Sequence, residues 1–202
     1  MLNNNILYAV SRLKVTHKGP SEISLCGTGF WINNNNEVLL VTNRHMVDLS
    51  WIKDIENPGD YCLNELLAGV HGFDSTKKTF TPEYTFIPIA TKDTTLKYSK
   101  NAANDLVVIP KIQPFLNPYK IWTIPLSSFA TQLDFDDVLN VGDQIVMIGF
   151  PDTWYDAKNN LPILRGGYIA GNPKVDYSDA LNRVRGNCLA IEPMFTSCKS
   201  NV

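Results

Sequence analysis

Short apolar runs separated by turn-forming residues extend along most of this 202-residue chain. The run at residues 6–15 (ILYAVSRLKV) begins apolar and then alternates, as a strand with one buried face does. Similar β-prone runs follow at residues 104–110, 141–151, 161–171 and 187–195. No amphipathic helix of appreciable length is indicated, so the pattern predicts an all-β fold, either a sandwich or a barrel.

Residues 26–48 (CGTGFWINNNNEVLLVTNRHMVD) give the clearest local prediction. Two apolar runs, residues 30–32 and 38–41, flank four asparagines, and asparagine tolerates the positive φ of tight turns. The segment therefore predicts a β-hairpin. Gly27 and Gly29, at the start of its first strand, leave room for a close backbone approach.

The segments between these runs are less regular. Residues 46–55 have helix-like spacing and predict one helical turn, which the turn-forming residues 57–60 (NPGD) end. Residues 61–100 predict short surface strands and loops, and His71, which has Gly69 and Gly72 close to it in the sequence, is expected to be exposed to solvent. Residues 114–125 predict an extended connector between two halves of the chain.

His45 and Asp105 are the candidate reactive residues. The second strand of the hairpin leads directly into His45, and a histidine titrates near physiological pH, as a general base must. Asp105 opens a β-branched run, so its carboxylate lies at the mouth of a buried strand. Each residue alone also has a plain structural interpretation, because isolated histidines and aspartates before strands are common in proteins without any reactive role.

Composition narrows the function classes. The chain has 18 basic and 20 acidic residues and no basic tract, which argues against a nucleic-acid or anionic-membrane partner. No apolar segment is long enough to span a bilayer, and residues 1–5 show no secretory signal, so we expect a cytoplasmic protein. The widely spaced Cys26, Cys62, Cys188 and Cys198 are expected to be reduced thiols, with no zinc site and no cofactor.

Several motifs, taken in order, resemble the trypsin-like serine peptidases. They are GTGF at residues 27–30, VTNRH at 41–45, NDLVVIP at 104–110, IGFP at 148–151 and WYDAKNNLPILRGGYIAG at 154–171. The chain is most similar to the intracellular, single-domain microbial branch of that family. The resemblance covers nearly the whole chain and implies two six-stranded β-barrels with the active site in the cleft between them.

Carried over to this sequence, the resemblance places His45 on the general base and Asp105 on the acid that orients it. It implies a first barrel at residues 1–118, complete and containing both residues. It implies a second, incomplete barrel at residues 119–202, because only about four strands fit there. The predicted fold is therefore a trypsin-like double β-barrel with the second barrel open, and its unpaired edges would favour self-association.

No residue of this sequence matches the nucleophile of the family. The family has a Pro-Gly-x-Ser-Gly-x-Pro segment, and alignment of the stretch that begins at Pro193 puts Thr196 and Ser197 on Pro-Gly and Lys199 on the nucleophile. No glycine follows Gly186, so the turn that presents two N–H groups to the oxyanion lacks its usual residues.

A shift of the alignment by one residue offers Ser200 or Cys198, but neither lies in a Gly-x-nucleophile-Gly frame. We therefore expect a member of the serine endopeptidase family, truncated or degenerate at its C-terminus, that does not hydrolyse peptide bonds. Its partner would be a polypeptide substrate or peptide ligand. Two alternatives remain open: a non-catalytic peptide-binding or scaffold module that uses the cleft between the barrels, and a gene-product fragment without a selected function.

Overall fold

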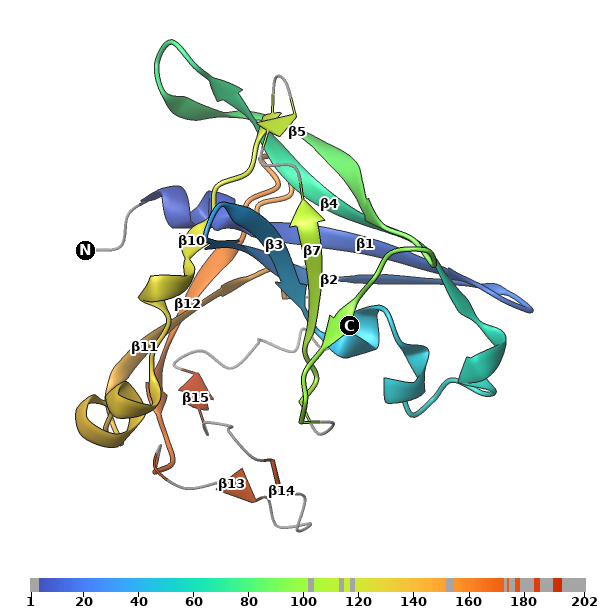
Figure 1. The fold of residues 1–202 in the computed structure, drawn as a ribbon. Coiled ribbons are helices and arrows are strands. Elements are labelled where there is room, and N and C mark those ends of the chain that lie inside the picture. The colour runs from blue at the N-terminus through green and yellow to red at the C-terminus, as the bar shows by residue number, and fades with distance from the viewer. Residues whose placement is uncertain are drawn as a thin grey trace, which may run out of the picture. The chain divides into compact units, whose positions relative to one another are not determined.

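The structure, a computed structural model, divides the chain into two compact units. Unit 1 comprises Met1–Ser128 and Gly149–Ile163, and unit 2 comprises Phe129–Ile148 and Leu164–Val202. The described residues are 4–101, 104–112, 115–116, 119–151, 155–172, 174, 177–178, 184–185 and 191–193. Strands predominate in both units, which confirms the prediction of an all-β fold (Figure 1).

Unit 1 is built on one large, mostly antiparallel sheet. Its strands are β1 (Val10–Lys18), β2 (Glu22–Asn34), β3 (Glu37–Thr42), β4 (Cys62–Asp74), β5 (Thr79–Ala90), β6 (Lys97–Tyr98), β7 (Val107–Ile112), β8 (Phe115–Leu116), β9 (Tyr119–Lys120) and β10 (Ile124–Pro125). The order is β6-β7-β3-β2-β1-β4-β9-β8, with β5 paired to β4 and β10 paired to β2. Within the described residues this sheet ends at β6 and β8 and does not close into a barrel.

The predicted hairpin is confirmed as β2 and β3. The two strands pair from Gly29↔Thr42 to Asn34↔Glu37, and the turn residues Asn35 and Asn36 have φ of 49° and 70°. Asparagine adopts this left-handed conformation more readily than most residues, so the four asparagines set the position of the turn.

The expectation of short surface pieces in residues 61–100 is wrong. The chain there forms the long strands β4 and β5, which pair along most of their length. Leu66, Ala68 and Val70 alternate along β4 with their side chains in the core, but Leu67 and Gly69 stand between them, so the sequence shows no regular alternation of apolar and polar positions there. His71 is also buried, with 6% of its surface exposed, because both faces of β4 are covered at this point.

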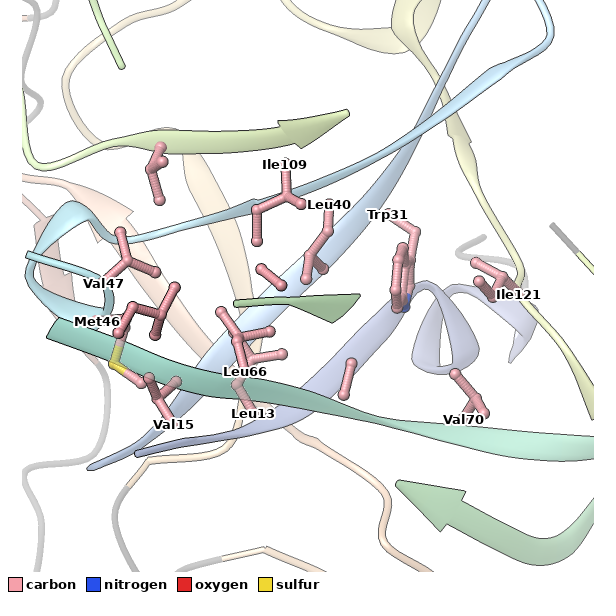
Figure 2. Packing of buried hydrophobic residues seen from close by; sticks show 14 of the residues in the cluster. Leu13, Val15, Trp31, Leu40, Met46, Val47, Leu66, Val70, Ile109 and Ile121 are labelled. Atoms are coloured by element: carbon pink, nitrogen blue, oxygen red, sulfur yellow. The ribbon is translucent and has the colours of Figure 1, made fainter. Parts of the chain in front are cut away.

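The hydrophobic core of unit 1 is formed by buried side chains from several strands of this sheet. Figure 2 shows Leu13, Leu40, Leu66 and Ile109 pointing toward one another, and all four are fully buried. Trp31 lies in the same cluster with no exposed surface. Its indole Nε1 donates to Ser11 Oγ at 2.7 Å, and Ser11 Oγ in turn donates to the backbone oxygen of residue 69 at 2.6 Å.

The helical segments of unit 1 that the structure describes are short. The 3₁₀ turns are η1 (Asn4–Ala9), η2 (Arg44–Met46), η3 (Leu49–Trp51), η4 (Pro58–Asp60) and η5 (Leu126–Ser128). The expected opening strand therefore begins later, at Val10, and the single helical turn expected in residues 46–55 is divided between η2 and η3. Among the described helices, none is long and apolar enough to cross a membrane.

Unit 2 has less regular structure. Its elements are the π-helical turn η6 (Asp134–Val138) and the strands β11 (Gln144–Gly149), β12 (Ile163–Ile169), β13 (Tyr177–Ser178), β14 (Val184–Arg185) and β15 (Ile191–Pro193). The order β11-β12-β15 forms a three-stranded sheet in the described part of the unit, and β13 pairs with β14. Ile169 is buried, whereas Leu133 (70%) and Val141 (59%) are exposed.

Candidate active site

His45 lies in η2, immediately after strand β3. Asn43 is extended and ends the strand, and the chain then turns so that Met46 and Val47 enter the core, where Figure 2 shows them beside the buried strands. The backbone oxygen of Met46 also accepts a hydrogen bond from His17 Nε2 at 2.9 Å. The backbone of His45 is thus held by the buried residues that follow it, while its own side chain remains 40% exposed.

Asp105 lies two residues before strand β7 and is brought next to His45 by the pairing of that strand. Strands β3 and β7 are antiparallel neighbours with Thr42 opposite Val107. The end of one strand therefore lies beside the beginning of the other. His45 comes three residues after Thr42 and Asp105 two residues before Val107, so the sheet register brings them together.

The two side chains form a direct hydrogen bond. His45 Nδ1 lies 2.6 Å from Asp105 Oδ2, and the backbone N–H of His45 donates to Asp105 Oδ1 at 2.9 Å. Asn43 Nδ2 donates to Asp105 Oδ2 at 3.2 Å and to the Asp105 backbone oxygen at 3.3 Å. The contact expected between His45 and Asp105 is confirmed; a catalytic role for the pair remains a prediction.

This geometry selects one tautomer of the imidazole. An ionised carboxylate can only accept hydrogen bonds, so the shared proton belongs to Nδ1 of His45. The other nitrogen, Nε2, then has a lone pair, and none of the described residues forms a hydrogen bond with it. Such an imidazole can take a proton from a hydroxyl or thiol, and the carboxylate stabilises the imidazolium that results.

A second charged pair lies beside the first. Nε and Nη2 of Arg44 donate to Oδ2 of Asp48 at 2.9 Å and 2.8 Å. The backbone N–H of Ser50 donates to Asp48 Oδ1 at 3.2 Å, so Asp48 caps η3. Partial burial opposes ionisation of Asp48, but the hydrogen bonds from Ser50 and Arg44 outweigh it and lower the pKa of this carboxyl. The motif around His45 gave no indication of this ion pair.

His71 is a buried histidine that the sequence wrongly placed in solvent. Its Nδ1 lies 3.4 Å from the backbone oxygen of Thr81, and its Nε2 lies 3.2 Å from the backbone oxygen of Asn160. The ring of Tyr8 packs edge-to-face against the imidazole, with 5.1 Å between the two ring centroids. Burial lowers the pKa of His71, and the two carbonyl contacts oppose that shift only in part. Asn160 comes from a distant segment, so no local pattern could have revealed this site.

The candidate nucleophile segment is not part of the described structure. Thr196, Ser197, Cys198, Lys199 and Ser200 lie outside the described residues. Among the cysteines that the structure describes, the two free thiols, at positions 26 and 62, are exposed. The described part of the chain holds no group of three or more His, Cys, Asp or Glu side chains that could bind a metal ion.

Comparison with known proteins adds no independent support. No model of a protein family matches the chain, and no curated protein matches it at a significant level.

Proposed function

We propose that this chain is a trypsin-like serine endopeptidase-family protein that has kept the base and the acid and lacks a working nucleophile. The observation that supports the proposal most directly is the hydrogen bond of 2.6 Å between His45 Nδ1 and Asp105 Oδ2. It joins residues 60 positions apart in the chain (105 − 45 = 60), at the two positions where the family motifs place its base and acid.

In the proposed ancestral reaction, His45 removes the proton from a serine hydroxyl as that oxygen attacks the peptide carbonyl. Asp105 keeps the imidazole in the required tautomer and stabilises its positive charge. Backbone N–H groups near the nucleophile would stabilise the oxyanion, and the loss of one such donor typically reduces the rate by about 10²–10³.

The proposed loss of activity rests on the aligned nucleophile position. Lys199 stands there and Ser197 replaces the expected glycine, so the 202-residue polypeptide contains no Gly-x-Ser-Gly segment. Residues of a triad act as a unit, and His45 and Asp105 retain little catalytic benefit without a nucleophile. We therefore expect no detectable hydrolysis of peptide bonds by this polypeptide.

A trypsin-like double barrel remains the proposed architecture of the family, with the second barrel open in this chain, and the described strands of unit 1 do not close into a barrel either. In the described part of unit 2, apolar side chains on the strands and turns are exposed, among them Val138, Val146, Leu164 and Tyr168 at 42–59%. Exposed apolar groups and unpaired strand edges favour association. Self-association of the chain is therefore part of this proposal.

A fluorophosphonate probe tests the proposal. The purified chain is treated with the probe beside a His45→Ala control, and covalent adducts are measured by intact-protein mass spectrometry. We expect no His45-dependent labelling, either in the natural chain or in a Ser197→Gly/Lys199→Ser double variant. Stoichiometric labelling of Ser200 that disappears in His45→Ala would show that the alignment is wrong and that the chain is a working peptidase.

A non-catalytic peptide-binding module is the second candidate, and one groove favours it. A hollow of about 210 Å³ in unit 1 is lined by Leu39, Tyr98, Leu106 and Val108, among others. Leu106 directly follows Asp105 and is 41% exposed. Retention of members of a peptide library by the natural chain, and their release by Leu106→Glu, would support this function over loss of all function.

A further inference from the structure

The geometry points to Arg44 as a positioning residue that holds His45 against Asp105. This inference rests on the proposed function of the His45–Asp105 pair. Among the described residues, the hydrogen bonds of the Arg44 side chain go to Asp48 and to neither partner of that hydrogen bond. It acts by joining the turn that contains His45 to the strand end that is bonded to both neighbours of Asp105.

Three groups surround the Arg44 guanidinium. Its Cζ lies 5.0 Å from the ring centroid of Trp51 and 4.8 Å from that of Tyr98. Asp48 accepts both of its short hydrogen bonds on one oxygen, with the side chains of the two residues each 25% exposed. A planar, delocalised cation can satisfy an aromatic face and a carboxylate together, which a lysine ammonium does less well.

We call Arg44 and its three partners, Asp48, Trp51 and Tyr98, the Arg44 clamp. One side of this clamp belongs to the turn after β3. Arg44 itself opens η2, Asp48 caps η3, and Trp51 ends η3. The backbone N–H of Asp48 also donates to the Arg44 backbone oxygen at 3.0 Å. The segment from residue 44 to residue 51 is therefore closed on itself by main-chain and side-chain contacts, with His45 at its beginning.

The other side belongs to β6 and the chain around Asp105. Tyr98 pairs with Val107 in the β6–β7 ladder, and the backbone N–H of Ser99 donates to the Leu106 oxygen at 3.4 Å. Asn104 Nδ2 donates to Ser99 Oγ at 3.2 Å. Both residues that flank Asp105 are thus bonded to Ser99, which directly follows β6, and the ring of Tyr98 in β6 lies against Arg44.

These contacts make Arg44 a link between two short segments. β6 has two residues and η2 has three, so neither is rigid by length alone. The hydrogen bond from His45 to Asp105 is directional, and it requires the two segments to stay in register. A neutral side chain at position 44 would remove the ion pair and the stacking together.

Proton NMR of the His45 Nδ1–H tests the inference without reference to catalysis. A His45→Ala variant assigns the resonance, and its exchange with solvent is measured in the natural chain, Arg44→Gln and Arg44→Lys. In Arg44→Gln we expect exchange about tenfold faster, equivalent to about 1.4 kcal/mol less free energy for local opening. The exchange rate in Arg44→Lys should lie between those of the natural chain and Arg44→Gln, because lysine keeps the positive charge and lacks the planar guanidinium.

Arg12→Gln is the matched control. Arg12 Cζ lies 4.4 Å from the ring centroid of Tyr155, also in unit 1, so this variant removes a similar cation–π contact that involves neither the turn after β3 nor β6. It should leave the exchange rate unchanged. Tyr98→Ala and Tyr98→Phe provide a second route if Arg44→Gln does not fold, and only Tyr98→Ala should accelerate exchange.

The outcomes separate the inference from the proposed function. If the natural chain shows the hydrogen-bonded Nδ1–H, and Arg44→Gln and Tyr98→Ala exchange no faster than Arg12→Gln, Arg44 has no positioning role. If the natural chain has no such resonance, the base–acid pair itself is refuted. Faster exchange in Arg44→Gln but an unchanged rate in Arg12→Gln supports the inference.

Discussion

Replacement of His71 should change how the stability of unit 1 depends on pH. Both ring nitrogens of His71 face backbone carbonyl oxygens, those of Thr81 and Asn160, at 3.4 Å and 3.2 Å. A neutral imidazole has one N–H and can donate to only one of them. Protonation would satisfy both, yet burial dominates and holds the pKa of His71 below its ordinary value of 6.5.

The sign follows from proton binding. A histidine with a lowered native pKa is protonated first in the unfolded chain, so below pH 6.5 the unfolded state binds more protons and stability falls with pH. The loss continues until the pH reaches the native pKa, at a limiting slope of about 1.4 kcal/mol per pH unit. At pH 5.5 the His71 contribution is therefore a loss of at most about 1.4 kcal/mol relative to a residue that does not titrate.

Two variants separate this proton effect from the loss of contacts. His71→Gln keeps a hydrogen-bond donor without titrating, and His71→Phe keeps the aromatic packing on Tyr8 while leaving carbonyl oxygens unsatisfied. At pH 7.5 we expect His71→Phe to be less stable than the natural chain by about 1–3 kcal/mol. For both variants, the stability difference from the natural chain should shift in favour of the variant as the pH falls from 7.5 to 5.5.

Denaturant unfolding at a series of pH values measures this shift. The other two histidines, His17 and His45, are present in all three proteins, so their contributions cancel in the differences. A stability difference between the natural chain and His71→Gln that stays constant from pH 7.5 to pH 5.5 would refute the reasoning, because it would mean that His71 titrates equally in both states.

Two further predictions concern the core and are checked by the denaturant midpoint. Gly29→Ala should destabilise unit 1 by about 2–3 kcal/mol, and Gly27→Ala by about 1 kcal/mol. A Cβ at position 29 would lie 2.9 Å and 3.0 Å from two buried leucine side chains, whereas one at position 27 meets the flexible end of Met46 at 2.8 Å. Equal losses of stability in the two glycine variants would contradict this prediction. Ser11→Ala should cost about 1–3 kcal/mol, because it leaves the buried Trp31 Nε1 without its acceptor and removes the hydrogen bond from Ser11 Oγ to the backbone oxygen of residue 69. A loss below that of an exposed serine-to-alanine change would contradict it.

The sequence was most informative where local chemistry sets the conformation. Asn35 and Asn36 mark the β2–β3 turn because few other residues adopt positive φ so readily. The close approach expected at Gly29 is confirmed, since an added Cβ would meet core side chains. His45 and Asp105 were paired through the order of the family motifs, and the register of β3 and β7 accounts for their contact.

Long-range packing could not be predicted from single segments. His71 was placed in solvent because its glycine neighbours suggested a loop, but Asn160, 89 residues away, covers it. The clamp around Arg44 was missed for the same reason. Its partner Tyr98 lies on a two-residue strand, which is too short to give a hydrophobic period.

As far as the structure describes the chain, the contacts that hold His45 and Asp105 come from unit 1. Among the described residues, Asp105 accepts from the backbone and ring of His45 and from Asn43, and the end of β6 binds its two neighbours. None of these contacts needs a nucleophile or any residue of unit 2. The pair can therefore persist in a chain that has no nucleophile beside it. Activity then depends on residues 196–200, and the labelling experiment is directed at that segment for this reason.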